Sequence, residues 1–86
     1  MQVELHKSFV KNFDKAPDKI QDTFVSRVSI FRENPLHPFL KNHALTGKYK
    51  DCRSINITGD IRAIYKQIDE NTAVFIALGS HSELYS

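Results

Sequence analysis

An α+β fold, with two N-terminal helices packed on one face of a three- to four-stranded antiparallel sheet, is what this sequence predicts. Three observations lead to it. Apolar residues recur at helical spacing in the N-terminal third, the apolar period shortens to about two after Cys52, and short turn sequences separate the later segments. Helices followed by closely connected strands are typical of α+β domains. We expect residues 1–86 to form one domain, because a chain of this length has room for a single core.

The N-terminal segment predicts a short edge strand followed by two helices. Residues 1–5 alternate between apolar and polar side chains, as a strand does. Ser8 is expected to cap the first helix, which should end near Lys15 because Pro17 disfavours helical angles at the residue before it. Pro17 then suits the first position of the second helix. That helix carries an apolar stripe made by Ile20, Phe24, Val28 and Phe31.

The C-terminal half predicts an antiparallel meander of three strands. Asn34 and Pro35 end the second helix, and an irregular segment follows. The expected strands, joined by short turns, are 53–58, 61–68 and 72–78, and the last is apolar enough to be central. Alternation turns Ile55 and Ile57 toward the helices. The opposite face of the sheet is then expected to be free, with these side chains pointing from it: Ser54, Asn56 and Thr58.

The composition argues against disulfide-bonded, membrane-spanning and secreted proteins. The single cysteine excludes an internal disulfide and fits a reducing compartment, and no apolar run is long enough to span a bilayer. The N-terminus carries charges where a signal peptide needs an apolar stretch, so we expect a cytoplasmic protein without membrane contact. The net charge is only +2, but basic side chains gather between positions 41 and 66. They are Lys41, His43, Lys48, Lys50, Arg53, Arg62 and Lys66.

Two of the four histidines have a context that favours chemistry. His81 follows a strongly apolar strand, and His43 lies just before the meander, so both could reach the same face. His6 and His37 have no such context. The HxH, HExxH and CxxC spacings of common metal sites do not occur, so neither a metal nor another cofactor is expected. Cys52, at the start of a strand, is interpreted as a small buried hydrophobe rather than a nucleophile.

Three sequence patterns occur together in the C-terminal half. They are H-x-L-x-G-x-[WY]-K…R from His43 to Arg53, D-x-x-x-x-Y-K from Asp60 to Lys66, and G-[ST]-H-x-x-L-[FY] from Gly79 to Tyr85. Taken together, they resemble the RelE/ParE toxin superfamily, and within it the YafQ-like, RelE/StbE-type mRNA interferases of type II toxin–antitoxin systems. The order of elements, two helices followed by an antiparallel sheet, resembles this superfamily over the whole chain. The sequence motifs resemble it only from His43 to Tyr85.

The resemblance implies a ribosome-dependent endoribonuclease that cleaves translated mRNA through attack by the RNA 2′-hydroxyl, without a metal. It implies His81 as general acid, Arg62 as phosphate clamp, and His43 with Asp60 as base or orienter. Tyr85 would stack on a base or orient it. Histidine suits both proton-transfer roles because it titrates near neutral pH. Further RNA contacts are expected from the remaining basic and polar residues of this surface: Lys48, Lys50, Arg53, Asn56 and Lys66.

Two positions depart from the family pattern. Asn56 stands where the YafQ-like branch has a histidine and the RelE branch a lysine, and Ile61 stands where YafQ-like toxins have a tryptophan. An amide cannot act as a base at neutral pH. Two alternatives therefore stay open: a ParE-like toxin that inhibits DNA gyrase by binding, and a catalytically impaired homologue that acts only by binding. The His43, His81 and Tyr85 set favours the nuclease.

The resemblance also implies partners. A cognate antitoxin would hold the toxin by covering its basic face, and operator DNA would be contacted only through that antitoxin. The ribosome and its mRNA would be the working context.

Overall fold

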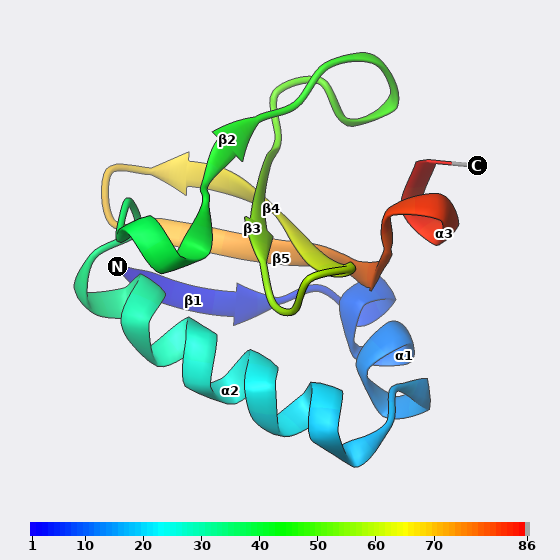
Figure 1. The fold of residues 1–86 in the computed structure, drawn as a ribbon. Coiled ribbons are helices and arrows are strands. Elements are labelled where there is room, and N and C mark those ends of the chain that lie inside the picture. The colour runs from blue at the N-terminus through cyan, green and yellow to red at the C-terminus, as the bar shows by residue number, and fades with distance from the viewer. Residues whose placement is uncertain (86) are drawn as a thin grey trace.

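The computed structural model describes residues 1–85, which form one five-stranded sheet with two long helices on one of its faces (Figure 1). The helices are α1 (Lys7–Lys15) and α2 (Asp18–Glu33), so the predicted α+β class is confirmed. The strands are β1 (Gln2–Leu5), β2 (His43–Ala44), β3 (Arg53–Asn56), β4 (Ile61–Asp69) and β5 (Thr72–Ser80). Short helices complete the fold: η1 (Pro38–Leu40), η2 (Gly47–Tyr49) and α3 (His81–Tyr85).

The strand order is β1-β5-β4-β3-β2. Strands β3, β4 and β5 form the expected antiparallel meander, and β5 lies inside the sheet, between β1 and β4, as predicted. β1 is the expected edge strand, but it runs parallel to β5, with Val3 opposite Ala73. β2 adds a further strand to the other edge of the sheet. The sheet is thus larger than predicted, because a two-residue strand is too short to show an alternating pattern in the sequence.

The predicted helix boundaries are nearly right, but the cap of α1 is not. The capping residue is His6, whose Nδ1 accepts a hydrogen bond from the Ser8 backbone N–H at 3.1 Å. The Ser8 hydroxyl instead donates to the Ile76 carbonyl at 2.6 Å and ties α1 to β5. Pro17 precedes α2 as its capping residue rather than opening it, and Asn34 caps the end of α2, where the sequence predicted the helix to stop.

The main core lies between the two helices and the sheet. The α2 stripe faces inward as predicted, with Phe24, Val28 and Phe31 buried and Ile20 packed at the margin. Aromatic rings interlock there at favourable tilted and edge-on angles; Phe31, for example, meets Tyr65 with centroids 4.9 Å apart. This packing fixes the sheet on which the rest of the molecule is built. No helix in residues 1–85 is long and apolar enough to cross a membrane.

The prediction that the second face of the sheet is free is wrong. Cys52, Ile64 and Leu84 form a second buried cluster there, and Leu45 and Tyr49 pack against it. Cys52 is therefore a buried hydrophobe, as expected. The covering elements are α3 and the loop that carries η2 (Figure 1). Because they cover only part of the face, they leave a depression between them.

Gly47 and the two residues on either side of it explain the L-x-G-x-Y part of the sequence motif. Leu45 and Tyr49 anchor the loop to the second cluster. Gly47, between them, has φ of 64°, a backbone conformation that side chains with a Cβ rarely adopt. The motif thus holds the loop against the sheet.

Candidate functional site

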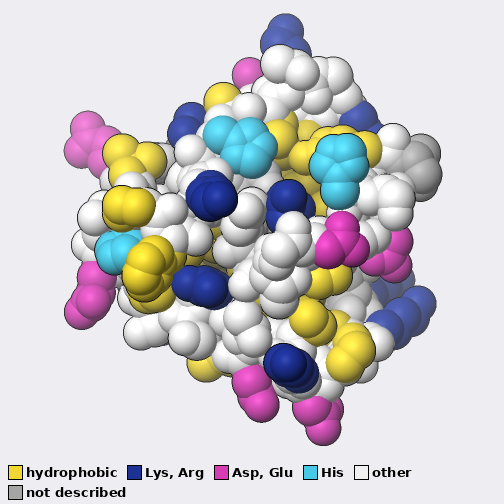
Figure 2. Space-filling view, in the orientation of Figure 1, with side chains coloured by type: hydrophobic (Ala, Val, Ile, Leu, Met, Phe, Trp, Pro, Cys, Tyr) yellow, Lys and Arg dark blue, Asp and Glu magenta, His cyan; other side chains and the backbone are white. Residues whose placement is uncertain are grey.

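A cleft of about 350 Å³ opens on the second face of the sheet, between the loop after β2 and helix α3. It brings together His43, Arg62, His81 and Tyr85, which the sequence analysis selected from positions far apart in the chain. Its remaining lining comes from Ala44, Leu45, Thr46 and Ser54. Figure 2 shows Lys, Arg and His side chains gathered around apolar atoms on the upper half of this face.

His43 lies at the start of β2 and is held in one tautomer. Its Nδ1 is 2.9 Å from the carbonyl oxygen of Lys41. A carbonyl can only accept a hydrogen bond, so Nδ1 carries the proton and, in the neutral ring, Nε2 is free to accept one. Lys41 has φ of 48°, and this left-handed conformation lets its carbonyl turn back toward the ring. The expected pairing of His43 with Asp60 is not seen among residues 1–85.

His81 opens helix α3, which is fixed by a reciprocal capping box. The Ser80 backbone N–H donates to Glu83 Oε1 at 2.8 Å, and the Glu83 N–H donates to Ser80 Oγ at 3.1 Å. Hydrogen bonds to the Glu83 carboxyl from the Ser80 backbone N–H and from the Ser80 side chain lower the pKa of that carboxyl below its ordinary value. Leu84, buried in the second cluster, anchors the same helix. The His81 ring is thereby positioned on the cleft wall.

Tyr85 joins His81 and Tyr49 in a row of aromatic rings. The His81 and Tyr85 centroids are 4.7 Å apart, and those of Tyr49 and Tyr85 are 5.6 Å apart at an angle of 88°. Burial raises the pKa of the Tyr85 phenol, Tyr49 raises it further, and the positive charge of Arg62 partly opposes both. The phenol is therefore neutral at cellular pH and can serve as a hydrogen-bond donor or a stacking surface.

Arg62 provides the positive charge in the cleft. Its Nη1 donates to the Thr58 and Gly59 carbonyls at 3.4 and 3.2 Å, which ties the guanidinium to the β3–β4 turn. Asn56 lies directly opposite Arg62 on β3, so the two side chains share one face, although Asn56 does not line the cleft.

Asp60 and Arg53 lie outside the cleft. Asp60 is exposed in the β3–β4 turn, where its backbone N–H donates to Thr58 Oγ1. Arg53 lies on the helix-side face of β3, and its Nε donates to Asn42 Oδ1 at 2.7 Å. Asn42 in turn donates to the Tyr65 hydroxyl at 2.8 Å, so Arg53 is part of a structural network.

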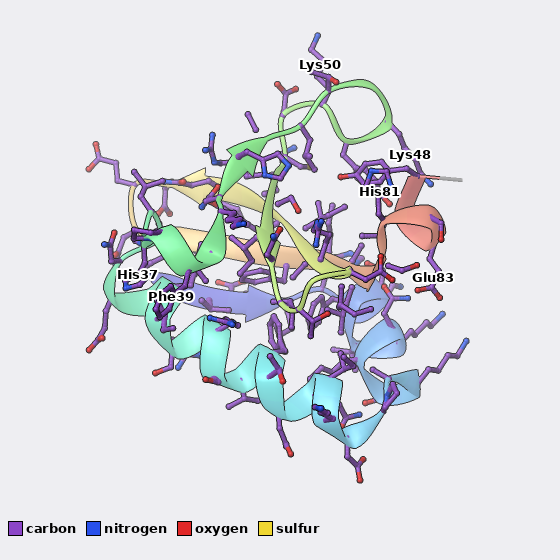
Figure 3. The ribbon with its side chains drawn as sticks, in the orientation of Figure 1. His37, Phe39, Lys48, Lys50, His81 and Glu83 are labelled. Carbon is purple, nitrogen blue, oxygen red and sulfur yellow. The ribbon has the colours of Figure 1, made fainter. Side chains whose placement is uncertain are left out.

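The three expected RNA-binding lysines are all exposed, at different distances from the cleft. Lys48 Nζ donates to the Leu84 carbonyl at 3.4 Å, which places it beside α3, and Figure 3 shows it next to His81. Lys50 lies at the tip of the loop in the same view. Lys66 lies on β4, on the same face as Arg62 by strand alternation.

His6 and His37 have capping roles away from the cleft. The Nδ1 atom of His37 accepts a hydrogen bond from the Phe39 backbone N–H at 3.1 Å, so His37 caps η1 in the same way that His6 caps α1. In residues 1–85 no three His, Cys, Asp or Glu side chains come together in a way that could hold a metal ion.

Some features that build the cleft were not predicted as parts of a site. Thr46 lines it, Ser54 lines it where only a place on the same face was expected, and the capping box of α3 orients one wall. Only the capping box has a local signal, the S-x-x-E spacing from Ser80 to Glu83. A buried serine in an alternating strand has none.

Comparison with known proteins assigns the family. The model of the YafQ family, described as a bacterial toxin of type II toxin–antitoxin systems, matches residues 1–86. The chain belongs to the YafQ toxin family. The resemblance found in the motifs is thereby confirmed. Among curated proteins, none matches the sequence.

Three solved structures are similar to this chain over nearly its whole length. The solution structure of a conserved hypothetical protein from Helicobacter pylori is 34% identical, with a TM-score of 0.68 and 99% of each chain covered. YafQ from E. coli is 21% identical, with a TM-score of 0.83 and 99% of this chain and 98% of that one covered. The E. coli DinJ–YafQ complex is 22% identical, with a TM-score of 0.72 and the same coverage. The E. coli structures support the fold.

Proposed function

We propose that this YafQ-family toxin is a ribosome-dependent endoribonuclease that cleaves translated mRNA by metal-independent acid–base catalysis. One observation carries the proposal: His43, Arg62 and His81, from three separate elements, line a single cleft. Together they supply two imidazole rings, which can accept or donate a proton, and one permanent positive charge. RNA cleavage by its own 2′-hydroxyl needs these groups and no others from the protein.

In the proposed reaction the 2′-oxygen bonds to phosphorus and the bond from phosphorus to the 5′-oxygen breaks. His43 Nε2 takes the proton of the 2′-hydroxyl, because its Nδ1 is engaged by the Lys41 carbonyl. His81 gives a proton to the departing 5′-oxygen. The products are a 2′,3′-cyclic phosphate and a 5′-hydroxyl. Each well-placed acid or base accelerates such a step by roughly 10²–10⁴-fold.

Arg62 is the proposed phosphate clamp. Both of its hydrogen bonds to the turn use Nη1, so within the described part of the chain Nη2 and Nε stay available for a phosphate. A guanidinium binds phosphate well because its N–H groups match the spacing of the oxygens. Asn56, opposite Arg62, can add a hydrogen bond to RNA but cannot replace the base, so that role passes to His43.

Substrate contacts beyond the cleft are proposed for the exposed lysines Lys48, Lys50 and Lys66, and a base-stacking role for Tyr85. Asp60 and Arg53 are weaker candidates, because the turn and the Asn42 network hold them away from the cleft.

The proposed partner is a cognate antitoxin. The likeness to the toxin chain of the E. coli DinJ–YafQ complex supports it, together with the family itself. Operator DNA would be contacted through that antitoxin. The ribosome would present the mRNA, since the small basic surface of the toxin offers few phosphate contacts.

The test is induction of the wild-type toxin and of His81→Ala and Arg62→Ala variants in a bacterial host, with primer-extension mapping of mRNA ends. We expect codon-phased cuts from the wild type and their loss in both variants. His37→Ala is the matched control, because His37 caps η1 outside the cleft, and it should still cut. Toxicity that survives His81→Ala without mRNA cuts would favour the binding-only toxin.

A further inference from the structure

Ser54 has the one buried side-chain N or O atom in residues 1–85 that lacks a hydrogen-bond partner. The residue is 0% exposed and yet lines the candidate cleft. A buried hydroxyl without a partner destabilises the fold, because it has given up its bonds to water. The fold therefore tolerates an unfavourable group at this position.

The surroundings of Ser54 do not require a hydroxyl. Cys52 lies two residues before Ser54, just ahead of β3, and Ile64 lies opposite Ser54 on β4. Both belong to the apolar second cluster. An alanine would fill most of the same space and would leave nothing unpaired. A structural role alone thus gives no reason for serine here.

The position of Ser54 relative to the cleft suggests what its partner is. Ser54 pairs with His43 on β2 and with Ile64 on β4. Arg62 lies two residues before Ile64 and so faces the same side of the sheet. The hydroxyl is therefore on the floor of the cleft, between the candidate base and the positive charge.

We propose that Ser54 Oγ binds an RNA phosphate oxygen when the substrate enters the cleft, and so acts as a substrate-positioning residue. The proposal rests on the proposed nuclease function and adds a specific contact to it. A hydroxyl in this place donates to an anionic oxygen and gains the partner that it lacks in the free protein. The exposed side chains of His43, His81 and Tyr85 around the cleft can move to admit the phosphate.

The test measures stability and binding on the same proteins. The variants are Ser54→Ala, the isosteric Ser54→Cys, and Ser26→Ala on the exposed side of α2 as the matched control. Thermal unfolding is recorded without ligand. Binding of adenosine 3′-monophosphate, and of inorganic phosphate separately, is followed by chemical-shift titration of the backbone amides. Arg62→Ala reports whether either probe occupies the cleft.

We expect Ser54→Ala to unfold at the same temperature as the wild type or higher, while its affinity for both phosphate probes falls about tenfold or more, since the lost bond is to a charged group. Ser54→Cys should behave similarly, and Ser26→Ala should change neither quantity. An unchanged affinity in both Ser54 variants would overturn the proposal, as would the absence of binding by the wild type.

Binding of these probes needs no RNA cleavage, so the two proposals can fail separately. If His81→Ala leaves toxicity intact while Ser54→Ala still weakens phosphate binding, the nuclease function is wrong and the binding role of Ser54 stands.

Discussion

Replacement of Asn42 with alanine is expected to destabilise this protein far more than a half-buried polar residue usually would. The Asn42 amide donates to the Pro35 carbonyl at 2.9 Å and to the Tyr65 hydroxyl at 2.8 Å, and it accepts from Arg53 Nε at 2.7 Å. It thereby joins the segment after α2 to strands β3 and β4, directly before His43.

The size of the effect follows from what each partner loses. Tyr65 is 1% exposed, so its hydroxyl would lose a partner where water has little access, at a cost of about 1–3 kcal/mol. Arg53 is half-exposed and can turn to water, so its lost bond adds only about 0.5–1 kcal/mol. With the Pro35 bond, the total is about 2–4 kcal/mol. For a chain of this size that lowers Tm by roughly 10–25 °C.

Urea and thermal unfolding of Asn42→Ala measure this loss, and Asn71→Ala, in an exposed turn, is the control. A double-mutant cycle with Tyr65→Phe isolates the orphaned hydroxyl. We expect the double variant to be more stable than the sum of the single losses by about 1 kcal/mol, because the phenylalanine leaves no unpaired group. Loss below about 0.5 kcal/mol in Asn42→Ala, or strict additivity, would refute the reasoning.

Three further outcomes are expected around α3. Because Ser80 lowers the pKa of Glu83, the capping box stabilises α3 fully above the ordinary pKa of glutamate and weakens as the pH falls through the lowered value. Amide hydrogen exchange in α3 should show this pH dependence, and Glu83→Gln should abolish it. Leu84→Ala should remove the exchange protection of the α3 amides but lower the overall stability less than Leu40→Ala, a change in the main core that costs about 2–5 kcal/mol. Equal effects of the two variants on α3 would contradict the role of Leu84 as the local anchor of this helix. The Tyr85 phenol should ionise above its ordinary pKa of 10.0, measured as the phenolate absorbance missing from Tyr85→Phe; ionisation at or below 10.0 would count against its burial.

The fold class and the positions of the main elements could be predicted because their signals are local. The apolar stripe of α2 repeats every turn, and the alternation of β3 and β4 sets which side chains face the helices. Prolines and polar turns mark where elements end. The motifs around His43 and His81 likewise lie in short stretches, so the family was visible in the sequence.

The parts that could not be predicted depend on contacts between distant residues. The parallel pairing of β1 with β5 joins residues about seventy positions apart, which no local pattern encodes. Arg53 was predicted to face RNA because it is basic, but its partner Asn42 lies on another segment. The capping of α1 was predicted wrongly for a similar reason. The Ser8 hydroxyl donates a hydrogen bond to the Ile76 carbonyl on the distant strand β5, and His6 caps the helix instead.

The motifs of the sequence were enough to predict the family and a set of candidate site residues, among them His43, Arg62, His81 and Tyr85. It is the folding of the chain that brings these four side chains into one cleft and leaves Asp60 outside it. The reason is physical. The capping box and Leu84 hold α3 against the second face of the sheet, the loop anchored by Leu45 and Tyr49 covers the rest, and the space left between them is the cleft.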